Sequence, residues 1–137
     1  MLLPSIDESD PHAVASRNVW LEILGQPMYS SAQVCEVLGK KTDNANDFAR
    51  GLRREGRLLG IWDGQQFQHP SWQFRGERLD ERVAALLAEL PGKHNGWDRA
   101  MWLWFPNELL EDRSPWERWE QDAAGVIEAA REEFKPD

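Results

Sequence analysis

A regular series of helix start and stop signals divides this chain into short segments, and it limits the possible fold more than any other feature. Capping side chains or prolines begin the segments, and glycines or prolines end them within about twenty residues. The signals predict helices over residues 10–25, 30–39, 42–56, 80–90, 95–105 and 114–134. The expected caps include Ser30 or Ser31, Thr42 or Asp43, Asn95 and Ser114. The sequence therefore predicts a mainly α fold.

Two of these helices, over 30–39 and 42–56, have the close spacing of a helix-turn-helix motif. In the second, one apolar stripe is expected to face inward, formed by Ala45, Phe48, Ala49 and Leu52. The outward face carries arginines and an asparagine, with two lysines just ahead, and such side chains suit base edges and phosphates of a major groove. The candidate DNA-binding residues are Lys40, Lys41, Asn46, Arg50, Arg53 and Arg54.

A β-hairpin is expected directly after this motif. Asp63 and Gly64 lie between two β-prone runs, which is the strongest short hairpin signal, and Leu59, Ile61 and Phe67 would line the strands. A recognition helix followed by a hairpin is the element order of a winged helix-turn-helix, and it favours DNA binding. Two plainer interpretations stay open: arginines are common on solvated helix faces, and winged helices also serve as protein-interaction modules.

The charge of the chain argues against a general nucleic-acid binder, because its net charge is −8 and its isoelectric point is near 4.9. The distribution is uneven, however. Residues 28–59 carry six basic and four acidic side chains, a net charge of +2, between two acidic regions. We therefore expect DNA contact, where it occurs, to be local to this segment.

The C-terminal half is expected to be a helical bundle. The inward faces of its three helices are predicted to carry Val83, Leu86, Leu87 and Leu90, then Trp97, Met101, Trp104 and Phe105, and then Trp116, Trp119, Ala123, Val126, Ile127, Ala130 and Phe134. Most of the tryptophans therefore belong to the expected core. Trp102 lies about 160° from Trp104 around a helix, so one of the two must face another surface.

The order of several motifs resembles the antitoxins of the Xre/MbcA/ParS-like group, which pair with RES-domain toxins. These motifs are "SSAQVCEVLG", "LRREGRLLGIWDGQQFQHPSWQF" and "WLWFPNELLEDRSPWERW", followed by a last helix. The stretch 69–74 and the series Trp97, Leu103 or Trp104, Pro106, Asn107, Leu110, Ser114 and Pro115 occupy comparable places. The match covers residues 28–134. One departure is Asp112, which replaces a glycine before the Ser-Pro turn, where a left-handed backbone would cost more without glycine.

The resemblance implies a type II antitoxin that binds a RES-domain toxin, which consumes NAD, and covers the entrance to its active site. It also implies two parts, a helix-turn-helix with hairpin over 28–75 and a toxin-binding domain over 76–137. Residues 1–27, with a helix of their own, are expected to form a leader outside the matched part. The candidate toxin-binding residues are Trp102, Arg113, Trp116 and Trp119, with Trp102 or Trp119 as the suggested anchor. Operator binding for autoregulation is a further expectation, and it would need a homodimer or a hetero-oligomer with the toxin to span two half-sites.

Two other protein classes stay open. A stand-alone winged-helix regulator would use the C-terminal bundle to dimerise and would have no toxin partner. An adaptor would bind another protein through the tryptophans and ignore DNA. An enzyme is not expected, because His12, His69 and His94 lie far apart in sequence and form no metal-ligand spacing with the lone Cys35. No catalytic residue, metal or cofactor is therefore predicted, and the chain is expected to be cytoplasmic and not to cross a membrane.

Overall fold

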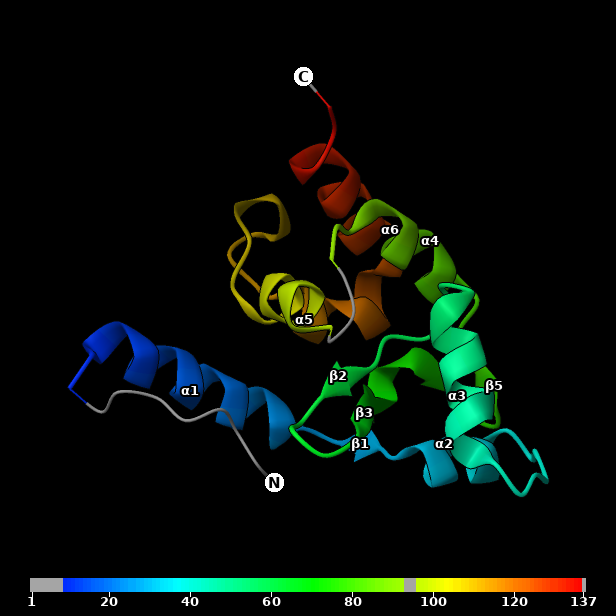
Figure 1. Cartoon of the computed structure of the whole chain (residues 1–137). Coiled ribbons are helices and arrows are strands. Elements are labelled where there is room, and N and C mark those ends of the chain that lie inside the picture. The colour runs from blue at the N-terminus through cyan, green and yellow to red at the C-terminus, as the bar shows by residue number, and fades with distance from the viewer. Residues whose placement is uncertain (1–8, 93–95, 137) are drawn as a thin grey trace.

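The structure is a computed structural model that describes residues 9–92 and 96–136, and its fold is mainly α with small antiparallel sheets (Figure 1). The first part of the chain forms α1 (Pro11–Leu24), β1 (Met28–Tyr29), α2 (Ser31–Val37) and α3 (Ala45–Arg54). Four short strands follow, β2 (Ile61–Trp62), β3 (Phe67–Pro70), β4 (Phe74–Arg75) and β5 (Arg78–Leu79). The remaining helices are α4 (Arg82–Glu89), α5 (Trp97–Trp104) and α6 (Pro115–Glu133), with 3₁₀ turns at Ser71–Gln73 and Glu108–Leu110.

Local capping explains where α2 and α3 begin. Ser30 caps α2 with a capping box, in which its hydroxyl accepts from the Gln33 backbone N–H and the Gln33 side chain accepts from the Ser30 N–H. The cap of α3 is Asn44, whose side chain accepts from the Asp47 N–H, so the expectation of Thr42 or Asp43 is wrong. Thr42 instead accepts a hydrogen bond from the Asn44 N–H, which places the helix start further along the chain.

A three-stranded sheet links the motif to the start of the chain. Its strand order is β1-β3-β2, and Tyr29 pairs with His69 while Trp62 pairs with Phe67. The predicted hairpin is therefore present, but its loop spans residues 63–66 instead of the two residues Asp63 and Gly64. The Asp63 carboxylate accepts from the N–H groups of Gln65 and Gln66 and closes this longer loop. The sequence did not indicate β1 or the β4-β5 hairpin, whose two-residue strands are too short to show an alternating pattern.

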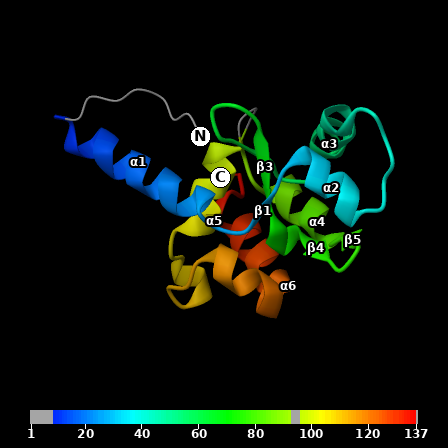
Figure 2. The same ribbon diagram turned by 90° about the horizontal axis from the view of Figure 1, so that it is seen from below.

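Two clusters of buried apolar side chains make up the core. The larger one joins α4, α5 and α6 to the end of α1 and to the segment that enters β2. It contains the predicted Val83, Leu86, Leu87 and Leu90, and also Ile23, Leu59 and Ile61 from the first half. The smaller cluster lies under α2 and α3 and consists of Val34, Leu52 and Leu58. In Figures 1 and 2, α1 projects away from the body of the protein, and its second half joins the core through buried Ile23, with Val19 and Leu24 packed against the same cluster. The Trp20 ring also lies 5.1 Å from the Trp97 ring of α5.

The bundle helices differ in detail from the expected pattern. In α5 the buried residues are Ala100 and Leu103, whereas Phe105 is 45% exposed, so the predicted inner face of this helix is rotated. The expected cap Asn95 lies outside the described residues. Ser114 caps α6 as predicted by accepting from the Glu117 N–H, and Pro115 stands at the first turn. The helix α6 is interrupted at Asp122, whose carboxylate accepts from the Gly125 N–H.

Candidate nucleic-acid interface

The exposed edge of α3 carries Asn46, Arg50 and Arg54, which lie four residues apart and therefore on one side of the helix. All three side chains are exposed. Arg50 forms an ion pair with Asp47 at 2.8 Å, and this contact holds its guanidinium along the helix. The opposite side of α3 is buried through Ala49 and Leu52, as the sequence predicted. The edge is thus free to meet a partner while the helix is anchored from behind.

Arg53 does not share this exposed edge, although the sequence placed it there. Its guanidinium carbon lies 4.0 Å from the centre of the Phe67 ring, and its Nη1 lies 2.8 Å from His69 Nε2. The side chain is half-buried, and burial together with nearby Arg50 lowers the pKa of its guanidinium. Arg53 therefore ties α3 to strand β3 through a cation–π contact and a hydrogen bond.

His69 is the partner that makes this tie possible. The ring is completely buried, and its Nδ1 lies 2.8 Å from the Tyr29 carbonyl oxygen, which can only accept a hydrogen bond. The network therefore assigns the proton to Nδ1 and leaves Nε2 to accept from Arg53. Burial lowers the pKa of His69 to about 4, against the raising effect of the Tyr29 hydrogen bond, and Arg53 lowers it further. The neutral ring joins β1, β3 and α3.

The two lysines ahead of α3 lie in the loop that joins it to α2. This loop spans residues 38–44 and is longer than the three or four residues of most helix-turn-helix turns. Both lysines are exposed. Lys40 Nζ lies 5.4 Å from the centre of the Phe48 ring, and Phe48 is about 160° around the helix from Arg50. Lys40 is thus separated from the arginine edge.

The β2-β3 hairpin occupies the place of a wing, but it is not basic. Residues 61–70 contain no lysine or arginine, and the loop instead exposes Gln65 and Gln66. Burial raises the pKa of Asp63, but hydrogen bonds from Gln66, Gln65 and Gln68 outweigh it and hold that pKa below its usual range. The hairpin therefore carries a charged carboxylate with amide groups around it, which can donate hydrogen bonds but add no positive charge.

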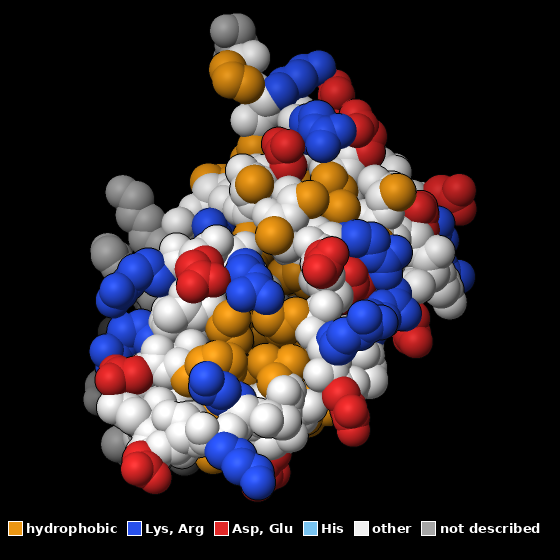
Figure 3. All heavy atoms as spheres, turned by 90° about the vertical axis from the view of Figure 1, so that its right-hand side faces the viewer, with side chains coloured by type: hydrophobic (Ala, Val, Ile, Leu, Met, Phe, Trp, Pro, Cys, Tyr) orange, Lys and Arg blue, Asp and Glu red, His pale blue; other side chains and the backbone are white. Residues whose placement is uncertain are grey.

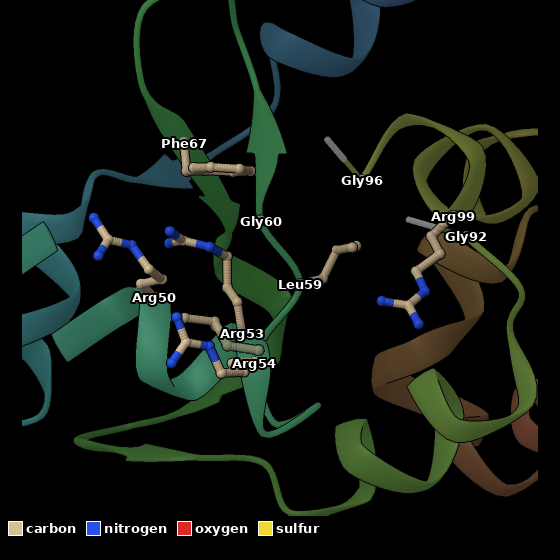
Figure 4. A pocket seen from close by; sticks show the side chains of 10 residues that line it. Arg50, Arg53, Arg54, Leu59, Gly60, Phe67, Gly92, Gly96 and Arg99 are labelled. Carbon is tan, nitrogen blue, oxygen red and sulfur yellow. The ribbon is translucent and has the colours of Figure 1, made fainter. Parts of the chain in front are cut away.

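A cavity of about 400 Å³ lies beside α3, between that helix and the start of α5 (Figure 4). Arg50, Arg53 and Arg54 line it from the α3 side, and Arg99 lines it from α5. The α3 and α5 residues are about forty-five positions apart in the chain, so no local pattern could have brought Arg99 to this site. We refer to this hollow as the arginine cavity.

The face formed by α2, α3, β5 and α4 is hollowed and apolar at its centre (Figure 3). A groove of about 660 Å³ there is lined by apolar side chains of α2, α3 and β5, namely Leu38, Phe48, Leu52 and Leu79. Arg75 and Arg82 both donate to the buried Asp80 carboxylate at its border. The hydrogen bond from Arg82 is the main cause that lowers the pKa of Asp80 to about 2. This pair joins β4 to the start of α4.

The candidate toxin-binding residues are not brought together on one surface. Trp119 is only 1% exposed, so its ring belongs to the core and offers nothing to a partner. Trp116 is half-buried, with ring centres 5.8 Å from Trp72 and 5.5 Å from Trp104. Arg113 is exposed in the turn before α6. Trp102 is half-buried and lies 5.9 Å from Phe134, away from the Trp116 cluster. Trp102 and Trp104 have different ring neighbours, Phe134 and Trp116, but both are half-buried and pack against the larger core cluster, so the expectation that one of them faces another surface is not confirmed.

The described residues offer little for chemistry. Within them, no group of three histidine, cysteine or acidic side chains is placed to hold a metal ion. Cys35 is buried, and desolvation raises the pKa of its thiol despite the nearby Lys40 charge. A search of the same residues finds no helix of the length and apolar character needed to cross a membrane.

No protein-family profile matches this chain, and no curated protein matches it. Among solved structures, the NMR structure of Rv2175c aligns with a TM-score of 0.65 at 20% sequence identity. The alignment covers 96% of this chain and 89% of that chain. At this identity the similarity establishes the fold and nothing about function. The chain is thus a mainly α protein in which two short helices and a short hairpin are joined to a helical bundle.

Proposed function

We propose that this protein binds duplex DNA through α3 and acts as a transcriptional regulator of the winged helix-turn-helix type. The observation that carries the proposal is the exposed edge of α3, where Asn46, Arg50 and Arg54 share one side of a well-anchored helix. Arginine and asparagine make the bidentate contacts that distinguish guanine and adenine in a major groove. The neighbouring hairpin, with its exposed glutamines, would lie against the adjacent backbone.

The net charge of −8 fits a binder that depends on a few contacts and not on a broad basic surface. We expect weak affinity for unrelated DNA and only a modest loss of binding with salt, because few phosphate contacts release few counterions. Helix-turn-helix proteins commonly bind as dimers whose two recognition helices meet half-sites one turn apart. The proposal therefore includes a homodimer, and it needs neither a cofactor nor a reaction.

The test measures binding of the purified chain to the DNA upstream of its own gene and to an unrelated duplex by fluorescence anisotropy at several salt concentrations. We expect the variant Asn46→Ala to lose preference for the upstream DNA, at roughly 1–3 kcal/mol for the base contact removed. Arg131→Gln is the matched control, because Glu89 and Glu128 already neutralise that arginine on α6. Absence of binding to any duplex at low salt would overturn the proposal.

A second candidate function, the antitoxin that the sequence resembles, is favoured by a different surface. Near the end of α5, a groove of about 660 Å³ is lined by Trp102, Phe105 and Leu109, and by Glu108, Glu132 and Glu133. Phe105 and Leu109 are 45% and 54% exposed, which is unusual for large apolar side chains. An apolar groove with an acidic border suits a basic partner surface. We propose this groove, not Trp116 or Trp119, as the contact for a RES-domain toxin.

Co-expression tests this second function. The tagged chain is produced with the protein encoded beside it, and the eluate is examined for a complex and for NAD consumption by the partner. We expect Phe105→Ser with Leu109→Ser to release the partner and restore NAD loss, while Trp62→Ala, an exposed ring on the hairpin, leaves the complex intact. A neighbour that neither co-purifies nor consumes NAD would leave the DNA-binding regulator as the function.

A further inference from the structure

The arginine cavity joins the two halves of the protein around a single positive hollow. Its volume is about 400 Å³, and its charged lining consists of Arg50, Arg53, Arg54 and Arg99. No aspartate or glutamate is among the described residues that line it. In a chain with a net charge of −8, four arginines around one hollow without a carboxylate form a local reversal of the overall charge. Such a cavity is complementary to an anion.

The arginines are only partly neutralised by their own surroundings. Arg50 is paired with Asp47, but among the described residues Arg54 has no ion pair. Arg99 reaches only the backbone carbonyl oxygens of Leu87 and Leu90, at 3.4 to 3.5 Å. These distances are at the long limit of a hydrogen bond, so the guanidinium keeps much of its capacity to donate. Desolvation lowers the pKa of Arg99 and that of Arg53. Both guanidinium groups have therefore lost part of their hydration, which an anion could replace.

Glycines allow the two walls to approach so closely. A Cβ atom at Gly96 would lie 1.9 Å from the Gly60 carbonyl oxygen, so the start of α5 can touch the segment before β2 only with glycine there. A Cβ atom at Gly92 would lie 2.9 Å from Arg99 Cγ, and one at Gly60 would lie 2.5 Å from Arg53 Cδ. The stems of both arginines therefore lie against bare backbone. Figure 4 shows Arg99 facing the gap from the α5 side and the α3 arginines on the other side.

We propose that the arginine cavity binds the phosphate backbone of DNA, with Arg99 contacting a phosphate from the α5 wall and Arg54 contacting the backbone from the α3 wall. Guanidinium groups bind phosphate oxygens with two parallel hydrogen bonds, so each wall of the cavity offers a group suited to a backbone phosphate. The assignment to DNA rests on the proposed function. Arg54 stands both on the exposed edge of α3 and in the cavity, so a duplex that meets this edge brings its backbone to the cavity.

The consequence is that the C-terminal bundle takes part in DNA binding. Arg99 would fix the orientation of α3 relative to the duplex without reading any base, because phosphates carry no sequence information. Removal of this contact should weaken binding to every duplex by the same factor. Removal of Asn46 should instead change the preference between sequences. The two effects can be separated in one set of measurements.

The test compares the wild-type chain with Arg99→Gln and Arg99→Lys, and with Arg131→Gln as the matched control. Affinity for the upstream duplex and for an unrelated duplex is measured from roughly 50 to 200 mM salt. For Arg99→Gln we expect the slope of log affinity against log salt to fall by about 1 on both duplexes. Arg99→Lys, which keeps the charge, and Arg131→Gln should keep the wild-type slope. Thermal melting of each variant shows that the chain is folded.

Nitrogen-edited NMR of the arginine Nε–H groups gives a direct readout of the cavity. The signals of Arg54 and Arg99 should shift when duplex is added, and that of Arg131 should not. If the wild-type chain binds duplex while Arg99→Gln keeps its slope and the Arg99 signal does not move, the phosphate site is wrong and the proposed function stands.

Failure of the proposed function has a different result. If no duplex binds at low salt, the same NMR titration is repeated with inorganic phosphate. A shift of the Arg54 and Arg99 signals would then support the phosphate site and assign it to a free phosphate compound instead of DNA. Absence of any shift would overturn the site altogether.

Discussion

The region around α2 and α3 and the C-terminal bundle are held together by different interactions. Among the described residues, three buried apolar side chains form the cluster under α2 and α3, whereas fifteen form the cluster of the bundle. Buried polar side chains compensate for the smaller core, since His69, Gln73 and Asp80 connect its strands and helices through hydrogen bonds. The comparison teaches that the region around α2 and α3 depends on satisfied polar groups, while the bundle depends on aromatic packing.

The largest effect is expected from the core of the bundle. Trp119→Ala removes a ring that is 1% exposed and packs 5.4 Å from the Trp72 ring centre. Loss of a buried tryptophan leaves a cavity and costs roughly 3–5 kcal/mol in the free energy of unfolding. Urea denaturation measures this loss. Trp62→Ala, which removes an exposed ring, should cost less than about 1 kcal/mol, and equal effects of the two would refute the distinction between core and surface tryptophans.

The stability of the region around α2 and α3 should depend on pH more strongly than that of the bundle. The pKa of His69 is about 4 in the folded chain and near 6.5 when unfolded, so between these values the unfolded chain binds more protons. The free energy of unfolding is therefore at its full value above pH 6.5 and falls by about 3 kcal/mol as the pH drops to 4. Urea denaturation of the wild type and of His69→Gln between pH 4 and 7 tests this prediction. If His69→Gln loses as much stability on acidification as the wild type, His69 is not the cause of the pH dependence.

A somewhat smaller effect is expected from Gln73, the buried amide of the first half. Its Nε2 donates to the carbonyl oxygens of Leu59 and Pro70, and its Oε1 accepts from the Leu59 N–H. Gln73→Leu leaves these backbone groups without partners and should cost roughly 2 kcal/mol. Hydrogen exchange would locate the loss at the Leu59 amide. Gln65→Ala on the exposed hairpin loop is the control. Equal stability of the Gln73→Leu and Gln65→Ala variants would refute the role of buried polar groups in the region around α2 and α3.

The smallest effect concerns the turn before α6. Glu111 and Asp112 both adopt a left-handed backbone, with φ of 57° and 62°, a conformation that favours glycine. Asp112→Gly should raise the free energy of unfolding by up to about 1 kcal/mol, and Asp112→Ala should lower it. Thermal melting of the two variants and the wild type measures both changes. A glycine variant that is less stable than wild type would show that the aspartate side chain contributes more than the strain costs.

The sequence predicted the helices well because their ends are local. Ser30 and Ser114 cap the helices that follow them through contacts three residues away, and Asp63 closes the hairpin through contacts of two and three residues. The cap of α3 was misplaced within the run of residues 42–44, where each side chain is a competent cap. The fold class and the order of the helices followed from these signals.

The candidate site was predicted only in part. The α3 edge at Asn46, Arg50 and Arg54 could be derived from helical periodicity, because exposure along one helix is a property of spacing. By helical periodicity Arg53 falls on the same side of α3. It is nevertheless half-buried, because Phe67 and His69 of β3 lie beside it. The burial of Trp119 beside Trp72 also depends on a distant element.

The amino-acid sequence by itself determined where the helices start and stop, that a hairpin follows the helix-turn-helix, and which side of α3 is exposed. These properties depend on hydrogen bonds and periodicities within a few residues. Only the tertiary structure decided that Arg99 joins the α3 arginines around one cavity, that His69 is neutral and holds Arg53, and which tryptophans are core. Those outcomes depend on which distant elements meet, and packing selects that meeting through the sum of many contacts that no local pattern records.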